Sequence, residues 1–275
     1  MDAASVAVPT IHHLSVSAAL LAAGIDVLVE KPLTSTLEEA AELIALANRN
    51  QRIAQVGHLE RFNPAVQATA PLLTKPMFFE VHRLSVFTPR SLDVDVVLDL
   101  MIHDIDVVLS FVKSKVKEIR AVGLPVVTGK ADIANARIEF ESGCVANLTA
   151  SRISTERVRK LRFFQPNEYI SVDYTRQDVL QFRVAGNRSL SPEQLWTAAA
   201  SSSVPIPGVT VNKPEIKPEE PLRAELKSFM NAVRQRSRPE VSLEDGREAL
   251  AVAFQILDAI RQHMLNANLT SLMTP

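Results

Sequence analysis

Residues 4–32 read ASVAVPTIHHLSVSAALLAAGIDVLVEKP, and this stretch decides the fold class. It contains an apolar run at 4–8, a segment at 12–23 that suits a helix, and a second apolar run at 26–29. Apolar runs without polar alternation are typical of strands buried on both faces. Gly24 follows the helical segment, and glycine is a common residue just beyond a helix end. We therefore predict a strand, a helix and a second buried strand.

The same alternation continues in the next 30 or so residues. A helix is expected at 36–49, with Thr36 as its N-cap and Glu39 three residues later, and a third strand at 52–57. Strands that alternate with helices over short links predict βαβ units, hence a parallel sheet with right-handed crossovers.

The pattern changes after about residue 65. Residues 77–87 alternate partly, as in a strand with one exposed face, and residues 95–112 suit a long, very apolar helix. Six further segments are strand-like: 116–127, 133–141, 144–153, 160–165, 169–174 and 179–184. Residues 191–220 are rich in Pro and Ser and predict a loop, and two helices are expected near 221–236 and 243–265. This order predicts a mostly antiparallel α+β layer with a long covering helix.

The sequence also lacks a feature that parallel sheets of this kind normally have. A dinucleotide-binding sheet opens with a strand, a glycine-rich turn and a helix, but the eight glycines here include no G-x-G-x-x-G spacing. We expect that about half of such a domain, on the order of 70 residues, is not present in this sequence. The fold class is thus α/β plus α+β, with a partial Rossmann-type sheet at 1–65, a substrate-binding and oligomerisation domain at 66–220, and helices at 221–275 that pack back on both.

Composition narrows the function classes. The net charge is −1 and charged residues make up 22% of the chain, so no nucleic-acid or membrane-surface partner is indicated. The single cysteine, Cys144, excludes an internal disulfide framework and fits a reducing compartment. The apolar run at 14–23 is too short to span a bilayer. A cytoplasmic location is expected.

Lys31 stands out because it follows a buried strand. Ligands of open α/β sheets bind at the carboxyl ends of the strands, and a partly desolvated lysine can have a lowered pKa. Lys31 could then hydrogen-bond a substrate hydroxyl. A solvated lysine at a strand end is the alternative.

A second polar set lies on the long apolar helix. Asp99 and His103 are four residues apart and share a helical face, with Asp106 near the same stripe. Histidine can accept a hydroxyl proton near neutral pH, and a carboxylate can orient its ring. An internal hydrogen-bonded pair and half of a metal site are the alternatives.

A basic cluster follows one of the later strands: Arg152, Arg157, Arg159, Lys160 and Arg162. Arg152 and Arg159 are candidates to bind a substrate pyrophosphate through charge-assisted hydrogen bonds. The alternative is a solvated strand edge, which basic residues commonly protect.

The order of these motifs resembles one known family. Pro9 to His13, Gly24 to Pro32, Gln55-Val56-Gly57 and Arg61-Phe62-Asn63-Pro64 are similar, over about 55 residues, to the P-x-x-x-H, G-x-x-V-x-x-E-K-P and V-G-x-x-x-R-F-x-P segments of the Gfo/Idh/MocA oxidoreductases. The phrases at 58–65 and 98–106 most resemble its nucleotide-sugar members.

The resemblance implies roles for several residues. It places Pro9, His13, Glu30, Lys31 and Arg61 around the nicotinamide end of the cofactor. A capping or core histidine is the alternative for His13, and a domain-linking salt bridge is the alternative for Arg61.

The family's D-x-x-x-H motif matches Asp99 and His103, facing the lysine. This sequence departs from the family at Val94-Asp95, where a glycine pair is usual, and at Met101, where a glycine is common.

The resemblance therefore implies an enzyme that oxidises a secondary sugar hydroxyl, at C3 of a UDP-linked N-acetylamino sugar. NAD is the expected cofactor, with NADP not excluded, and no metal is expected. His103 would be the base, Lys31 would polarise the hydroxyl and Asp99 would orient His103.

Two alternatives belong to other classes. One is a non-catalytic module for sugar-nucleotide binding or oligomerisation, and the other is a metal-dependent lyase or isomerase built on Asp99 and His103. The uncovered sheet face predicts a homodimer or homotetramer.

Overall fold

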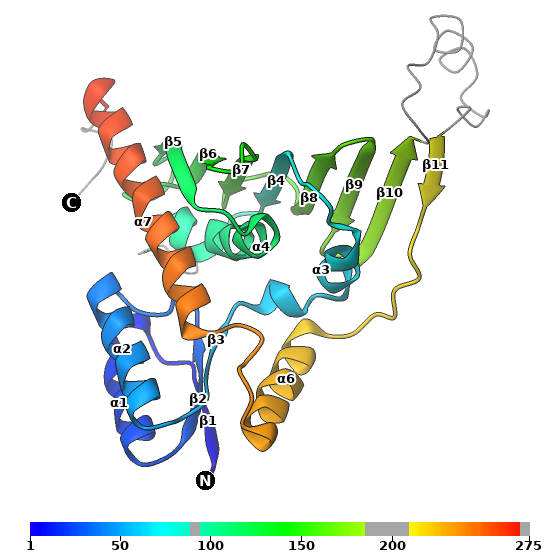
Figure 1. Ribbon diagram of the computed structural model, residues 1–275. Helices are drawn as coiled ribbons and strands as arrows, with labels where there is room; N and C mark the ends of the chain where they lie inside the picture. The colour runs from blue at the N-terminus through cyan, green and yellow to red at the C-terminus, as the bar shows by residue number, and fades with distance from the viewer. Residues whose placement is uncertain (89–93, 185–208, 270–275) are drawn as a thin grey trace, which may run out of the picture.

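The computed structural model describes residues 1–88, 94–184 and 209–269. A parallel sheet in the order β1-β2-β3 is formed by β1 (Ala3–Val6), β2 (Asp26–Glu30) and β3 (Ala54–Gly57). The crossovers contain the short turn η1 (Thr10–His12) with α1 (His13–Ala22), and α2 (Leu37–Arg49). The two helices lie side by side against this sheet (Figure 1). The predicted parallel βαβ units are confirmed.

Local sequence signals set the ends of these elements. Gly24 has a φ of +78° just beyond α1, a conformation that costs glycine little. The Thr36 hydroxyl accepts a hydrogen bond from the Glu39 backbone amide at 3.2 Å, and the Glu39 carboxylate accepts one from the Ser35 amide. The N-cap predicted for α2 is confirmed.

The second sheet has eight strands in the order β11-β10-β9-β8-β4-β7-β6-β5. Its strands are β4 (Phe78–Leu84), β5 (Val116–Leu124), β6 (Ile133–Phe140), β7 (Val145–Ser151), β8 (Val158–Gln165), β9 (Glu168–Asp173), β10 (Asp178–Val184) and β11 (Val209–Asn212). Within the described strands, β4 and β7 are parallel neighbours and all other neighbouring pairs are antiparallel. The mostly antiparallel sheet is thus confirmed.

Helices connect the two sheets. The π turn η4 (Val97–Met101) and α4 (Ile102–Val112) pack on one face of the large sheet, and α7 (Leu243–Asn266) runs from the parallel sheet along α4 to β5 (Figure 1). The helix α6 (Pro221–Gln235) packs against the turn η2 (Leu59–Phe62). A capping box at Ser242 and Asp245 starts α7, as predicted. Among the described helices, none has the length and apolar character needed to cross a membrane.

Three differences from the sequence analysis matter. The long helix predicted at 95–112 starts with a π turn, the short helices η2, α3 (Pro64–Thr69) and η3 (Ala70–Leu72) were not predicted, and β11 lies in the predicted loop at 191–220. The first part of that loop, 191–208, lies outside the described residues. The domain boundaries at 65 and 220 remain predictions.

Candidate functional site

The Lys31 side chain joins the two sheets. It leaves the carboxyl end of β2, and its Nζ donates a hydrogen bond to the Asp99 carbonyl oxygen at 2.5 Å and lies 3.5 Å from the Asp99 carboxylate. Burial lowers the pKa of Lys31, and the Asp99 charge opposes that shift. A lysine with a lowered pKa, aimed from one sheet at a helix of the other, can exchange a hydrogen bond or a proton with a bound hydroxyl.

His103 lies close enough to Lys31 for their charges to interact. Burial lowers the pKa of His103 well below its ordinary value, and the charge of Lys31 is the next cause. The His103 Nδ1 atom is buried and has no hydrogen-bond partner among the described residues. A neutral imidazole with an unused nitrogen is suited to accept a proton.

Asp99 lies on the π turn that precedes α4. Its hydrogen bond and ion pair in the structure are with Lys31. In a π turn the hydrogen bonds span five residues, so its side chains follow a different spacing from those of an α-helix. The same-face expectation for Asp99 and His103 assumed a regular α-helix, and the role of Asp99 in orienting His103 remains a prediction.

His58 is a polar residue that the sequence analysis gave no role. It follows β3 directly, and the register Glu30↔Gly57 places it next to Lys31 at the carboxyl edge of the parallel sheet. His58 is 1% exposed, and neither ring nitrogen has a hydrogen-bond partner among the described residues. A histidine at the end of a third buried strand was the signal that could have identified it.

A fully paired charge network lies beside these residues. The Arg83 guanidinium of β4 donates to both Asp104 carboxylate oxygens at 2.7 and 2.9 Å and to Glu60 at 2.9 Å. Its centre is 5.3 Å from the Tyr174 ring centroid, within cation–π range. Burial alone would lower the pKa of Arg83, but the two carboxylates outweigh it and raise the pKa. This network joins β4, α4 and η2.

His13 and Pro9 have structural contacts. His13 is 1% exposed, and its ring nitrogens lie 3.0 Å from the Pro32 carbonyl oxygen and 2.9 Å from that of Val8. The Pro9 carbonyl accepts the His12 amide in η1. These contacts match the alternative of a core histidine, and a cofactor role for either residue remains a prediction.

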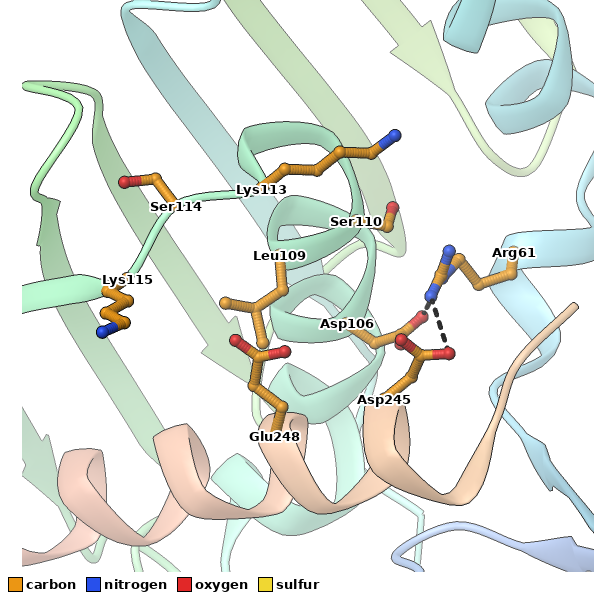
Figure 2. A pocket seen from close by; sticks show the side chains of 9 residues that line it. All are labelled: Arg61, Asp106, Leu109, Ser110, Lys113, Ser114, Lys115, Asp245 and Glu248. Atoms are coloured by element: carbon orange, nitrogen blue, oxygen red, sulfur yellow. Dashed lines mark hydrogen bonds and ion pairs between the residues drawn. The ribbon is translucent and has the colours of Figure 1, made fainter.

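Arg61 links three elements. Its Nε donates to the Asp106 carboxylate of α4 at 2.9 Å, and its Nη2 lies 3.9 Å from the Asp245 carboxylate of α7. Figure 2 shows this arrangement at the edge of a cavity of about 390 Å³. The contacts are those of the alternative interpretation, a domain-linking salt bridge.

The basic cluster divides between two environments. Arg152 is 5% exposed and donates to the Val94 carbonyl, with Asp132 3.9 Å away. Arg159 and Arg83 are direct cross-strand neighbours, and the Arg159 Nε is buried with no hydrogen-bond partner among the described residues. Burial lowers the pKa of Arg159, and Arg83 adds to that shift.

Lys160 and Arg162 of the cluster are half-buried and pair with carboxylates of neighbouring strands, Asp173 and Glu80. Because β8 is hydrogen-bonded to β4 and β9, it is no edge strand, and the protected-edge interpretation of the cluster is wrong. An interior strand needs no such protection, and the charges face neighbouring strands instead.

The described residues also include no group of three or more His, Cys, Asp or Glu side chains arranged to hold a metal ion.

Comparisons with known proteins agree with this architecture. Residues 1–58 match the family model described as "Oxidoreductase family, NAD-binding Rossmann fold", and residues 77–167 match the GFO/IDH/MocA C-terminal domain. The chain is 36% identical over 261 residues to a UDP-N-acetylglucosamine 3-dehydrogenase of Acidithiobacillus ferrooxidans, covering 94% of this chain and 79% of the relative.

Solved structures agree as well. A structure of that enzyme from Acidithiobacillus ferrooxidans aligns with a TM-score of 0.84 at 35% identity, over 94% of this chain and 79% of the other. An inositol dehydrogenase homolog of Azotobacter vinelandii, solved with NADH and myo-inositol, aligns with a TM-score of 0.76 over 95% of this chain and 76% of the other. At 17% sequence identity, this structural alignment shows a shared fold alone. The two family models, the relative and the common architecture show that this chain belongs to the GFO/IDH/MocA family of oxidoreductases.

Proposed function

We propose that this chain oxidises a secondary hydroxyl of a sugar, at C3 of a UDP-linked N-acetylamino sugar, with NAD as the hydride acceptor. His103 accepts the hydroxyl proton, and Lys31 donates a hydrogen bond to the same oxygen. Asp99 holds the Lys31 ammonium in place through the contacts at 2.5 and 3.5 Å. In this arrangement the backbone carbonyl and the carboxylate of Asp99 position the lysine.

The observation that carries the proposal is the Lys31–Asp99 contact. Lys31 and Asp99 are 68 residues apart in the sequence, and their contact brings the carboxyl edge of the parallel sheet to the helix that carries His103. Ligands of open α/β sheets bind at that edge. The relative's printed activity, UDP-N-acetylglucosamine 3-dehydrogenase, supports the choice of sugar and carbon.

The residues at this edge fit the nicotinamide end of NAD. Lys31 is half-buried and His58 is buried at the strand ends, and the His58 ring nitrogens lack partners among the described residues. At Gly57 a Cβ atom would lie 3.1 Å from a Glu30 carboxylate oxygen, so the edge is closely packed there. The 275 residues contain no G-x-G-x-x-G turn for the pyrophosphate. When bound, NAD accepts the hydride; NADP is the second possibility for this role.

Arg159 is the proposed contact for the substrate pyrophosphate. It points to the same face of the large sheet as Arg83, and its charge also acts on His103. A guanidinium with an unused Nε is a good donor to phosphate oxygens. The burial and backbone hydrogen bond of Arg152 favour a structural role for that residue.

The test is turnover of UDP-N-acetylglucosamine with NAD in purified protein, for the wild type and the variants Lys31→Gln and His103→Gln. Loss of a positioned acid or base commonly costs about 100-fold to 10,000-fold in rate. We expect both variants to lose at least about 100-fold. His263→Gln, at an exposed position near the end of α7, is the control and should keep the wild-type rate. Near-normal rates in both site variants would refute the assignment.

The non-catalytic module is the second candidate, favoured by the missing glycine-rich turn. Isothermal titration of the 275-residue chain with UDP-N-acetylglucosamine and with NAD separates the two functions. Binding of the nucleotide sugar with no binding of NAD supports the module, and binding of both supports the enzyme.

A homo-oligomer formed through the uncovered face of the large sheet is a further part of the proposal. On that face Phe78, Phe164, Tyr169 and Phe182 make a cross-strand aromatic row, with ring centroids 5.0–5.7 Å apart. Phe164 is 39% exposed. A second copy of the chain would cover this row of aromatic side chains.

We also propose a cytoplasmic location, with which the single cysteine agrees.

Phe164→Glu tests the oligomer, because it places a charge in the middle of the aromatic row. Light scattering should give the monomer mass for this variant and a dimer or tetramer mass for the wild type. Arg261→Glu, at an exposed position on α7 away from that sheet face, is the control. A monomeric wild-type protein would contradict the proposal.

A further inference from the structure

The surface of α6 carries an apolar stripe. Leu222, Leu226 and Met230 recur every four residues and so lie along one face of the helix. Their side chains are 44%, 40% and 37% exposed, and no other described helix carries more than one large apolar side chain that is as exposed. The residues that α6 buries lie on an adjacent face, so its apolar surface extends beyond the part that the fold covers.

The stripe lines a groove of about 590 Å³. All of the lining residues belong to α6 and its N-cap Glu220, so the side chains of this single helix form the groove. A second helix fits such a groove, because its side chains pack between those of the first. In Figure 1, α6 lies on the side of the large sheet that carries α4, away from the uncovered face. The groove is therefore separate from the sheet face that we propose for the oligomer.

The charged residues beside the stripe differ between its two ends. Glu220 stands at the start of α6 and Arg234 in its last turn, and both are exposed. Neither of them forms an ion pair among the described residues. Arg223 and Lys227 lie between them, and both interact with Glu219 of the same chain. The stripe thus has an acidic start and a basic end.

This pattern is self-complementary in an antiparallel pair of α6 helices. About a two-fold axis at Leu226, Leu222 of each copy faces Met230 of the other, and the two Leu226 side chains meet at the axis. The start of each helix comes beside the end of the other, so the Glu220–Arg234 pair forms twice, and the helix dipoles run in opposite directions. A two-fold interface requires a patch that complements itself in this way.

We propose that α6 is a second self-association surface, on which α6 of another copy of this chain packs antiparallel about a two-fold axis at Leu226. The proposal is independent of the proposed reaction. Three apolar side chains per copy, flanked by exposed ion pairs, are typical of a small, transient interface. The contact should therefore form at high protein concentration.

Sedimentation velocity in the Phe164→Glu background tests this surface, since that variant lacks the sheet-face contact. The mass should move from the monomer toward the dimer as the protein concentration rises to about 1 mM. Leu226→Glu in the same background should raise the dimer dissociation constant at least about 10-fold, because it brings two carboxylates together at the axis. Leu265→Glu, at an exposed apolar position on α7, is the control and should leave the constant unchanged. A monomer at every concentration would assign the stripe to a different partner and overturn the proposal, and so would a dimer that ignores Leu226→Glu.

A charge exchange tests the antiparallel arrangement in the same background. Arg234→Glu and Glu220→Arg each bring like charges together at both ends of the pair, and each should weaken self-association about 10-fold. A mixture of the two variants places opposite charges at both ends, so the mixed dimer should form as readily as the dimer of the Phe164→Glu parent. Circular dichroism checks that each variant keeps its helix content. A mixture that associates no better than either variant alone would refute the arrangement.

Discussion

Two polar clusters lie side by side where the sheets meet, and they differ in how completely they are hydrogen-bonded. In the closed cluster, Arg83 makes three hydrogen bonds to Asp104 and Glu60 at 2.7–2.9 Å. In the open cluster, which consists of Lys31, His58 and His103, three ring nitrogens have no partner among the described residues. His58 is 1% exposed and Arg83 is 2% exposed, so exposure does not explain the difference between these two residues.

The difference separates residues that stabilise the fold from residues that are available for the reaction. A buried charge is tolerated when its hydrogen bonds are satisfied, and the closed cluster fulfils that condition while it ties β4 to α4 and η2. The open cluster is costly for stability and is useful when a ligand or a moving proton supplies the missing partners. We therefore expect changes in the closed cluster to affect unfolding, and changes in the open cluster to affect turnover.

Arg83→Leu should have the largest effect on stability. It leaves Glu60 and Asp104 buried without their cation, which typically costs about 3–5 kcal/mol. Urea unfolding measures the change. Arg137→Leu, which removes an exposed pair with Glu139 at 3.4 Å, is the control and should cost no more than about 1 kcal/mol. Equal effects of the two variants would end the distinction between the clusters.

Glu225 on α6 extends the comparison to a carboxyl group. It is 1% exposed, its Oε1 has no partner among the described residues, and burial, followed by the charge of Glu30, raises its pKa to about 8. The folded protein thus keeps a proton that the unfolded chain has lost, so stability falls as the pH rises from the ordinary pKa of 4.5 to about 8.

Glu225→Gln should remove this pH dependence, which amounts to about 5 kcal/mol across the window from 4.5 to about 8 because one pKa unit corresponds to about 1.4 kcal/mol. Urea unfolding at several pH values within it gives the slope. The exposed Glu244→Gln should keep the wild-type slope. A wild-type slope in Glu225→Gln would show that the carboxyl ionises normally.

Lys31→Met should have the smallest effect on stability, within about 1 kcal/mol of the wild type. The cost of burying the ammonium offsets its attraction to Asp99, whose side chain is 27% exposed. Thermal unfolding checks this, in parallel with turnover. A loss of stability as large as that of Arg83→Leu would show that Lys31 mainly stabilises the fold and does not serve the reaction.

Much of the fold, and the position of Lys31 within it, could be predicted from the sequence. The apolar runs before Glu30 and Gly57 predicted buried parallel strands, and so located Lys31 at a ligand-binding edge. The capping pairs at Thr36 and Ser242 predicted two helix starts correctly. Asp99 was selected as a polar residue within an apolar helix, but the π turn that carries it was not predicted, because such a turn has no clear periodic signal.

The sequence by itself determined the order of the elements, the parallel and antiparallel character of the two sheets and the choice of Lys31, Asp99 and His103. Hydrophobic periodicity and capping act over a few residues, so one chain segment is enough to reveal them. Only the tertiary structure decided which polar groups meet: Lys31 with Asp99, Arg61 with Asp106, and His58 with no partner among the described residues. These pairings join segments 45 and 68 residues apart, and their geometry depends on how both sheets pack around one helix.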